Sequence, residues 1–348
     1  MWPSQEQALD GLTAPRIFQD VFCFYLGLAL PSLVSGVGMS IPDGQRGARR
    51  VCDAYGHQLG LATLPGGHQE TVWHDPLVRL LASFCQRAGI TVTREARSLF
   101  ADVLDQDLLH RPHCGIIPDL VAEMRRAAAG VLDGRARLVR CLFDTKTVFA
   151  GNTLYQRAAR GTQREAAVEA RARAVPVDYI RHARQQDHAM LVRRTREAAG
   201  PDADPIALAR RIAALPTWGA MAPGPCLTRL REYPPCEGLA FGSYGEASPA
   251  VYTFLGVVAR AIAEREWREM GSRSESEARG IISTQLYRQL CVATVGGHMR
   301  VIHARAHYLG RSHDAAIAEA ERQRAPDAAT AAAWPAPRPL AAGPRGGG

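Results

Sequence analysis

Hydrophobic residues recur along the chain with two periods, which predict helices and strands. Spacings of three and four residues predict helices over residues 16–30, 75–88, 161–187, 205–215, 249–270 and 275–309. Alternating or continuous β-branched and apolar residues predict strands over residues 90–95, 114–121 and 137–149, and over 238–246 for a strand that enters a glycine-rich turn. Helices and strands in this mixed order indicate an α/β protein.

Proline and glycine place several of the expected boundaries. The helix that starts near Arg16 should end before Pro31, and Pro176 should kink or divide the helix over 161–187. In that helix the apolar positions, Val177 and Ile180 among them, should pack against a sheet. The Gly, Pro and Arg content of residues 36–50 predicts a loop.

These boundaries suggest three parts. Residues 1–50 are expected to form an N-terminal helical lead-in and loop. Residues 51–310 are expected to form the main domain, with an insertion at about 190–236. Residues 311–348 would hold the end of the last helix and a tail whose Ala, Pro and Gly content predicts disorder.

A charged pair interrupts the apolar segment 137–149. Asp144 and Lys146 share one face of the predicted strand, because side chains alternate along it. The chain has 41 arginines, and Lys146 is its one lysine. Arginine stays charged and presents a wide fork, whereas lysine is a compact charge whose pKa can move. We therefore expect the position to require lysine; the alternative is a chance survivor in an arginine-biased composition.

A second carboxylate, Asp119, follows Pro118 in another short apolar segment. Two carboxylates from neighbouring strands, with a lysine beside one of them, can bind a hard divalent cation through oxygen while the ammonium faces a water and a phosphate. That arrangement favours phosphodiester cleavage. The alternative is an α-rich scaffold or interaction protein, in which Asp144 and Lys146 form a structural ion pair and Asp119 lies far away.

Composition supports a globular protein with an anionic partner. Of 348 residues, 47% are hydrophobic and 22% charged, and the formal net charge is +8. A basic balance favours nucleic acid, with a membrane surface second. Residues 21–39 carry no charge, but Pro31 and the glycines there favour a buried helix over a membrane span.

Cysteine usage points to a reducing compartment. The eight cysteines are scattered without a Cys-x-x-Cys pair, which indicates no disulfide framework. The first residues lack the positive segment of a secretory signal, so we expect a nuclear or cytoplasmic protein that is not secreted. One window offers ligands for Zn²⁺ (Cys52, His57, His68 and His74), although its spacing fits none of the compact finger patterns and loop histidines are common.

With Pro118-Asp119 and Asp144-Thr145-Lys146, the sequence resembles the PD-(D/E)XK nuclease superfamily. Residues 25–28, 52–74 and 238–248 and the C-terminal helices are similar to endonuclease domains found near reverse transcriptases in retrotransposon-derived genes. The resemblance implies a restriction-endonuclease-like central mixed sheet flanked by helices, with additional N- and C-terminal helices.

The resemblance also implies roles for single residues. Asp119 and Asp144 would bind Mg²⁺ or Mn²⁺, and the Thr145 main-chain carbonyl would add a ligand. Lys146 would orient or deprotonate the attacking water. Glu95 would be an additional acidic ligand, or else an exposed strand residue. A helix after the Asp-x-Lys strand would lie beside the substrate, which offers Gln163, Arg164, Arg171, Arg173 and Tyr179 as phosphate contacts, unless they form a solvated face.

The function expected from the resemblance is a metal-dependent endonuclease that hydrolyses nucleic acid, with DNA favoured over RNA. A reverse transcriptase on another chain is the expected protein partner. The alternative within the same fold is a nucleic-acid-binding relic without turnover, because a fold does not guarantee its chemistry.

Overall fold

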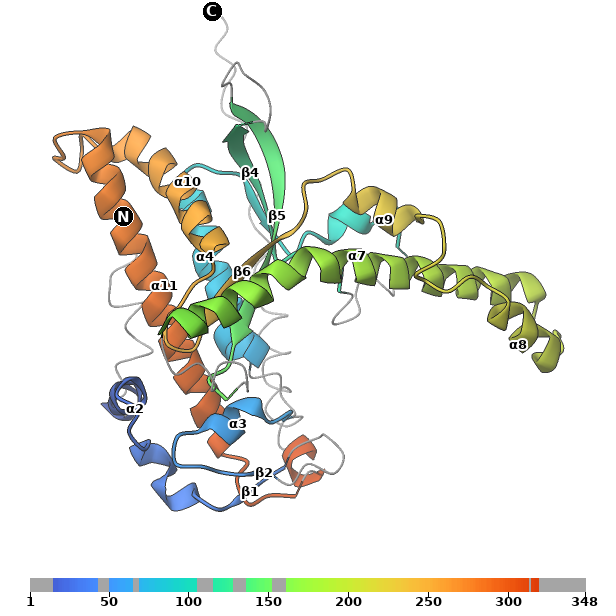
Figure 1. The fold of residues 1–348 in the computed structure, drawn as a ribbon, viewed down its shortest axis with the longest axis horizontal. Coiled ribbons are helices and arrows are strands. Elements are labelled where there is room, and N and C mark those ends of the chain that lie inside the picture. Colours follow the sequence, from blue (N-terminus) through green and yellow to red (C-terminus); the bar gives the residue numbers. More distant parts are fainter. Residues whose placement is uncertain are drawn as a thin grey trace, which may run out of the picture.

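The structure is a computed structural model that describes residues 15–42, 50–64, 69–104, 115–127, 136–151, 161–312 and 314–318. The described part contains a four-stranded sheet, a separate two-stranded sheet, and helices packed around the larger sheet (Figure 1). The predicted α/β class is confirmed at this level. The tail over 324–348, for which we predicted disorder, lies outside the described residues.

In chain order the described elements are α2 (Pro15–Tyr25), η1 (Pro31–Gly36), β1 (Ser40–Ile41), β2 (Arg50–Val51), α3 (His57–Leu61), η2 (Gln69–His74), α4 (Asp75–Arg87), β3 (Val92–Arg94), η3 (Arg97–Phe100), β4 (Leu120–Ala127), β5 (Ala136–Val148), α7 (Gly161–Ala199), α8 (Pro205–Ala213), α9 (Pro225–Leu230), β6 (Glu237–Gly242), α10 (Pro249–Glu266) and α11 (Glu275–Ala306). No helix among these is long and apolar enough to cross a membrane.

The larger sheet has the order β3-β4-β5-β6. The first two pairings are antiparallel, and β5 pairs with β6 in parallel. Leu120 faces Phe143, so one step further Asp119 stands opposite Asp144. On its other side Asp144 pairs with Gly238 of β6. The sheet is thus mixed, and its register brings the two acids together.

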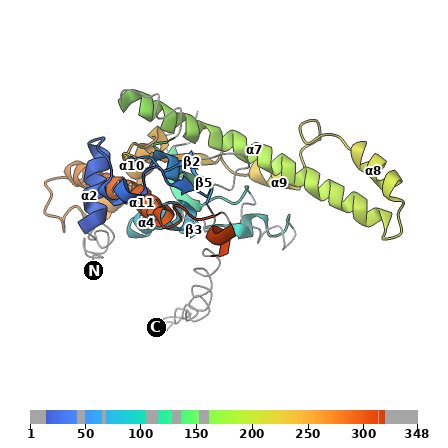
Figure 2. The same ribbon diagram turned by 90° about the horizontal axis from the view of Figure 1, so that it is seen from below.

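The two faces of the sheet pack against different helices. Cys141 and Phe143 belong to a core shared with α4, α10 and α11. Leu142, on the opposite face, packs with Val175 of α7 and Leu227 of α9. Figure 2 shows α7 along one side of the molecule and α4 with α11 along the other. Because Asp144 and Lys146 continue the face of Leu142, they lie on the α7 side.

Helix α7 differs from its prediction in length, continuity and phase. It runs unbroken for 39 residues, past the body of the protein toward α8 (Figure 1), with Pro176 inside it. The expected burial of Val177 and Ile180 is wrong, since these side chains are 63% and 46% exposed, and Val175 and Tyr179 are buried instead. Tertiary packing offsets the cost of an internal proline, about 3 kcal/mol.

Gly238 explains how α7 reaches the sheet so closely. A Cβ at this position would lie 2.5 Å from the main-chain oxygen of Ala172 in α7. A second anchor sits further along the helix, where the buried Asp187 accepts hydrogen bonds from the amides of Cys226 and Leu227 at 2.8 and 3.1 Å. Asp187 thereby caps the start of α9 from outside that helix.

Other boundaries agree well or shift for local reasons. The helices predicted over 75–88, 205–215, 249–270 and 275–309 are confirmed, and so is the strand over 137–149. Helix α2 ends at Tyr25 and not before Pro31, because Gly27 adopts φ 69° and the Leu28 amide closes the helix on Cys23 O at 2.8 Å. Asp119 precedes β4, whereas the expected strand over 114–121 contained it.

Candidate active site

Asp119, Asp144 and Lys146 meet at one place between the sheet and α7. The Thr145 amide, between the other two in sequence, donates a hydrogen bond to Asp119 Oδ2 at 2.6 Å. Lys146 Nζ lies 2.5 Å from Asp144 Oδ2. The trio that the sequence singled out is therefore close in space, which differs from the distant Asp119 expected of a scaffold protein.

Asp144 is the most buried member of the trio, with a side chain 6% exposed. Its Oδ1 accepts a hydrogen bond at 3.1 Å from the hydroxyl of Tyr179, which also lies 3.1 Å from Ile117 O. Its Oδ2 is buried and lies against the ammonium of Lys146. Burial raises the pKa of Asp144, and the charge of Asp119 raises it further, against Lys146 and Tyr179.

Asp119 is held through a single oxygen. Its Oδ2 receives the Thr145 amide and lies 3.0 Å from Nε2 of His74, while its Oδ1 accepts no hydrogen bond from the described residues. The other ring nitrogen of His74 lies 3.1 Å from Oδ1 of Asp75. Burial lowers the pKa of His74, but the hydrogen bonds and charges of Asp119 and Asp75 outweigh it and raise this pKa to about 10.

Asp119 Oδ1 accepts no hydrogen bond from the described residues, and Asp144 Oδ2 faces the ammonium of Lys146. In the part of the chain that the structure describes, no group of three or more His, Cys, Asp or Glu is arranged to hold a metal ion. A two-carboxylate set suits Mg²⁺, which keeps several waters and is usually held by one or two protein carboxylates. The residues present therefore fit a magnesium ion.

Glu95 does not join the trio. It has φ 44°, its side chain is 65% exposed, and it pairs with Arg97 at 3.1 Å. Only its main chain reaches the site, where the Glu95 amide donates to Asp119 O at 3.0 Å. The arrangement matches the alternative of an exposed residue at the end of a strand.

The candidate zinc ligands that the structure describes have different neighbours. The buried Cys52 places its sulfur 3.6 Å from Asp53 O, and His57 stacks on Tyr55 with ring centroids 5.8 Å apart. His74 is committed to Asp119 and Asp75, and His68 lies outside the described residues.

The three arginines of α7 that were expected to contact phosphate lie against other side chains of the protein. Arg164 lies 4.2 Å above the Tyr244 ring and 4.0 Å from Glu246, Arg171 pairs with Asp178 at 3.4 Å, and Arg173 pairs with Glu169. Tyr179 is a correction, because it is 4% exposed and bonds to Asp144 and so cannot lie on the phosphate-facing surface. The side chain of Gln163 lies outside the described part.

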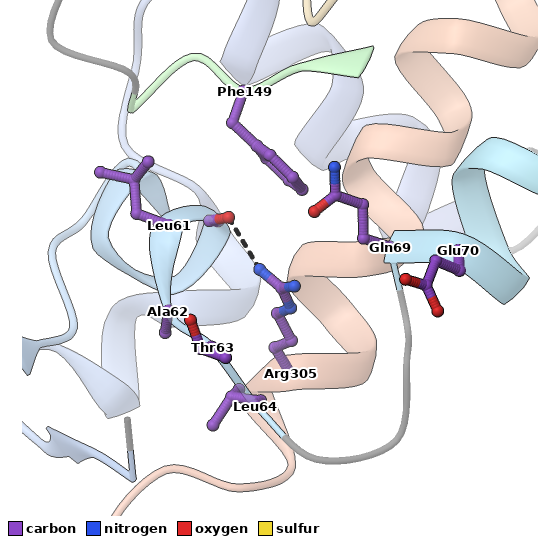
Figure 3. A pocket seen from close by; sticks show the side chains of 9 residues that line it. Leu61, Ala62, Thr63, Leu64, Gln69, Glu70, Phe149 and Arg305 are labelled. Carbon is purple, nitrogen blue, oxygen red and sulfur yellow. Dashed lines mark hydrogen bonds between the residues drawn. The ribbon is translucent and has the colours of Figure 1, made fainter. Parts of the chain in front are cut away.

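No member of the trio lines the cavity drawn in Figure 3. Its volume is about 240 Å³, and its wall includes Gln69, Phe149 and Arg305. Arg305 is 6% exposed and donates to the main-chain oxygens of Leu59 and Gly60 at 3.0 and 2.7 Å. Its guanidinium is thus tied to the end of α3.

Comparison with known proteins identifies no relative: no family model, curated protein or solved structure matches the chain.

Two roles in the site were missed by the sequence analysis, the link from His74 to Asp119 and the inward position of Tyr179. One signal was present for the first, since His74-Asp75 lies directly at the start of a strongly predicted helix.

Proposed function

We propose that the protein is a metal-dependent endonuclease with a restriction-endonuclease-like core, and that DNA is its substrate. One observation carries the proposal: Asp119, Asp144 and Lys146 converge from adjoining strands at the α7 side of the sheet. Two acids beside a single ammonium are the groups that phosphodiester hydrolysis needs.

Each residue has a chemical role in this proposal. Asp119 and Asp144 would hold the cation, and Tyr179 fixes the buried carboxylate of Asp144 by donating a hydrogen bond to its Oδ1. A bound Mg²⁺ lowers the pKa of water and offsets charge on the phosphate. Lys146, whose side chain is 29% exposed, orients the attacking water and faces the negative charge that develops on the phosphate.

The cost of burying Asp144 supports a chemical role over a structural one. Removing a carboxylate from water costs free energy that an ion pair, such as that of Asp144 with Lys146, repays only in part. The net charge of +8 supports an anionic polymer as the substrate. Hydrolysis on this pattern would leave a 5′ phosphate and a free 3′ hydroxyl.

A plasmid assay tests the proposal. The purified chain should nick supercoiled DNA when Mg²⁺ or Mn²⁺ is present and stop when a chelator is added. Asp119→Asn keeps an acceptor for the Thr145 amide but removes the charge, and Lys146→Ala removes the ammonium, so both should lose cleavage. Lys146→Arg should also fail, because the planar guanidinium is too wide for the contact with Asp144.

Asp102→Asn is the matched control. Asp102 is 61% exposed and pairs with Arg229 away from the trio, so this variant should cleave like the parent protein. Circular dichroism and thermal unfolding establish that every variant is folded. If the parent protein binds DNA in the presence of metal but never cleaves it, the endonuclease proposal fails and the relic takes its place.

A further inference from the structure

From the hydrogen bonds around Asp119 we infer that His74, held by Asp75, is a positioning residue that fixes one oxygen of this carboxylate and leaves the other for a divalent cation. The inference rests on the proposed function and adds a pair of residues to its site. His74 Nε2 lies 3.0 Å from Asp119 Oδ2, and His74 Nδ1 lies 3.1 Å from Asp75 Oδ1.

Both ring nitrogens of His74 face carboxylate oxygens. Carboxylates accept hydrogen bonds, so a ring nitrogen of His74 that carries a proton donates to the carboxylate it faces. Asp119 Oδ2 thus has two neighbours that can donate, the Thr145 amide of β5 and the His74 ring of η2. Two donors on one oxygen prevent the carboxylate from turning, so Oδ1 keeps its direction.

His74 is well placed for this role because the π-helical turn η2 is fastened to β5 at both ends. At its start, Gln69 Nε2 donates to Thr147 Oγ1 at 3.0 Å. At its end, the fully buried Trp73 packs edge-on against Phe149, with ring centroids 4.8 Å apart. A turn of this type is rare and frequently marks a functional site.

Trp73 is also locked from the side of α11. Gly297 allows the indole to lie directly on that helix, since a Cβ there would collide with the Trp73 ring. His74, the residue after Trp73, is therefore fixed relative to the strand that carries Asp144 and Lys146. Changes in residues that orient a metal ligand typically weaken metal binding or activity roughly 10- to 100-fold.

A test must separate the charge of His74 from its position. Loss of a positive charge at His74, next to Asp119, would by itself strengthen the binding of a divalent ion. His74→Gln and His74→Leu both lack the positive charge. The glutamine amide can still donate to Asp119, whereas leucine cannot. A purely electrostatic role for His74 would change both variants equally, and a positioning role separates them.

The experiment is a Mn²⁺ titration of the full chain, followed by calorimetry or by the loss of the free Mn²⁺ signal in electron paramagnetic resonance. We expect His74→Leu to bind Mn²⁺ roughly tenfold or more weakly than His74→Gln. The matched control is His303, which pairs with Asp20 at 2.5 Å. His303→Leu and His303→Gln should bind Mn²⁺ with equal affinity.

Asp75 provides a second pair of variants that should fold, because its side chain is 46% exposed. Asp75→Asn and Asp75→Ala both lose the charge, but only asparagine still accepts the His74 Nδ1 proton. Alanine should therefore weaken Mn²⁺ binding more than asparagine. Equal affinities within both pairs overturn the inference alone, whereas a parent protein that binds no Mn²⁺ overturns the proposed function and the inference together.

Discussion

The two faces of β5 are built from alternate residues of one strand, yet they differ in chemistry. On one face Phe143 is 1% exposed and meets the ring of Phe254 edge-on, with centroids 5.2 Å apart, in a core of apolar side chains. On the other face Asp144 and Lys146 lie under α7, with Tyr179 bonded to the carboxylate. Apolar burial on the first face stabilises the folded state, whereas the buried charge on the second face costs free energy.

The difference accords with the chemistry that we propose for the α7 face. Apolar burial lowers the free energy of the folded state roughly in proportion to the area removed from water. A buried ion pair contributes little by comparison and is often neutral relative to apolar residues of the same volume. Substitutions on the two faces should therefore have opposite patterns of effect on stability and on cleavage.

The largest effect on stability is expected from the apolar face. Phe143→Ala removes a buried ring and leaves a cavity, so it should lower the free energy of unfolding by about 3–5 kcal/mol. Urea unfolding followed by circular dichroism measures this value. Leu138→Ala, on the same strand but 65% exposed, should change stability by less than about 0.5 kcal/mol. A similar loss in both variants would contradict the comparison.

A smaller effect is expected from pH, through His298 of α11. Burial, together with the charges of His57 and Arg305, lowers the pKa of His298 from its ordinary 6.5 to about 3. The unfolded chain binds this proton near pH 6.5 but the folded chain does not, so stability is lost as pH falls below 6.5. The loss should be about 1.4 kcal/mol per pH unit, or about 2 kcal/mol at pH 5.

Urea unfolding at pH 7, 6 and 5 measures this dependence in the parent protein and in His298→Leu. Other titrating groups contribute equally to both proteins, so the difference between their slopes isolates His298. If the free energy of unfolding fell with pH equally in both proteins, His298 would have an ordinary pKa. The apolar core would then have no part in the acid sensitivity.

The smallest effect on stability is expected from the charged face. Asp144→Asn removes a buried charge but keeps an acceptor for Tyr179, and Lys146 is exposed enough to turn toward water. The free energy of unfolding should change by less than about 1 kcal/mol, while cleavage is lost. A destabilisation as large as that of Phe143→Ala would instead favour the scaffold interpretation, in which Asp144 and Lys146 form a structural ion pair.

The sequence predicted best what depends on local pattern. The spacing of Leu77, Leu81 and Cys85 predicted α4, and the apolar run before Asp144 predicted β5. The meeting of Asp119 with Asp144 depends on strand register, which is not local. It was expected because the two acids lie in short apolar segments that could form neighbouring strands, and because the two motifs resemble a known signature.

The rest was hidden for physical reasons. The turn η2 has no periodic pattern, so the position of His74 before a predicted helix did not show that it faces Asp119. Helix α7 is rich in alanine and arginine, whose short or amphipathic side chains leave its rotation ambiguous. Its rotation is set by tertiary contacts. Gly238 lets the backbone at Ala172 come close to the sheet, and Asp144 accepts a hydrogen bond from the Tyr179 hydroxyl.

The lone lysine also gives the protein a chemical handle. An amine-selective reagent finds one side-chain target in the whole chain, besides the terminal amine, and that target lies 2.5 Å from Asp144. An ammonium held against a carboxylate must lose both its partner and its proton before it reacts. The rate of acylation at this single position therefore reports how often the pair opens, with no need for an engineered label.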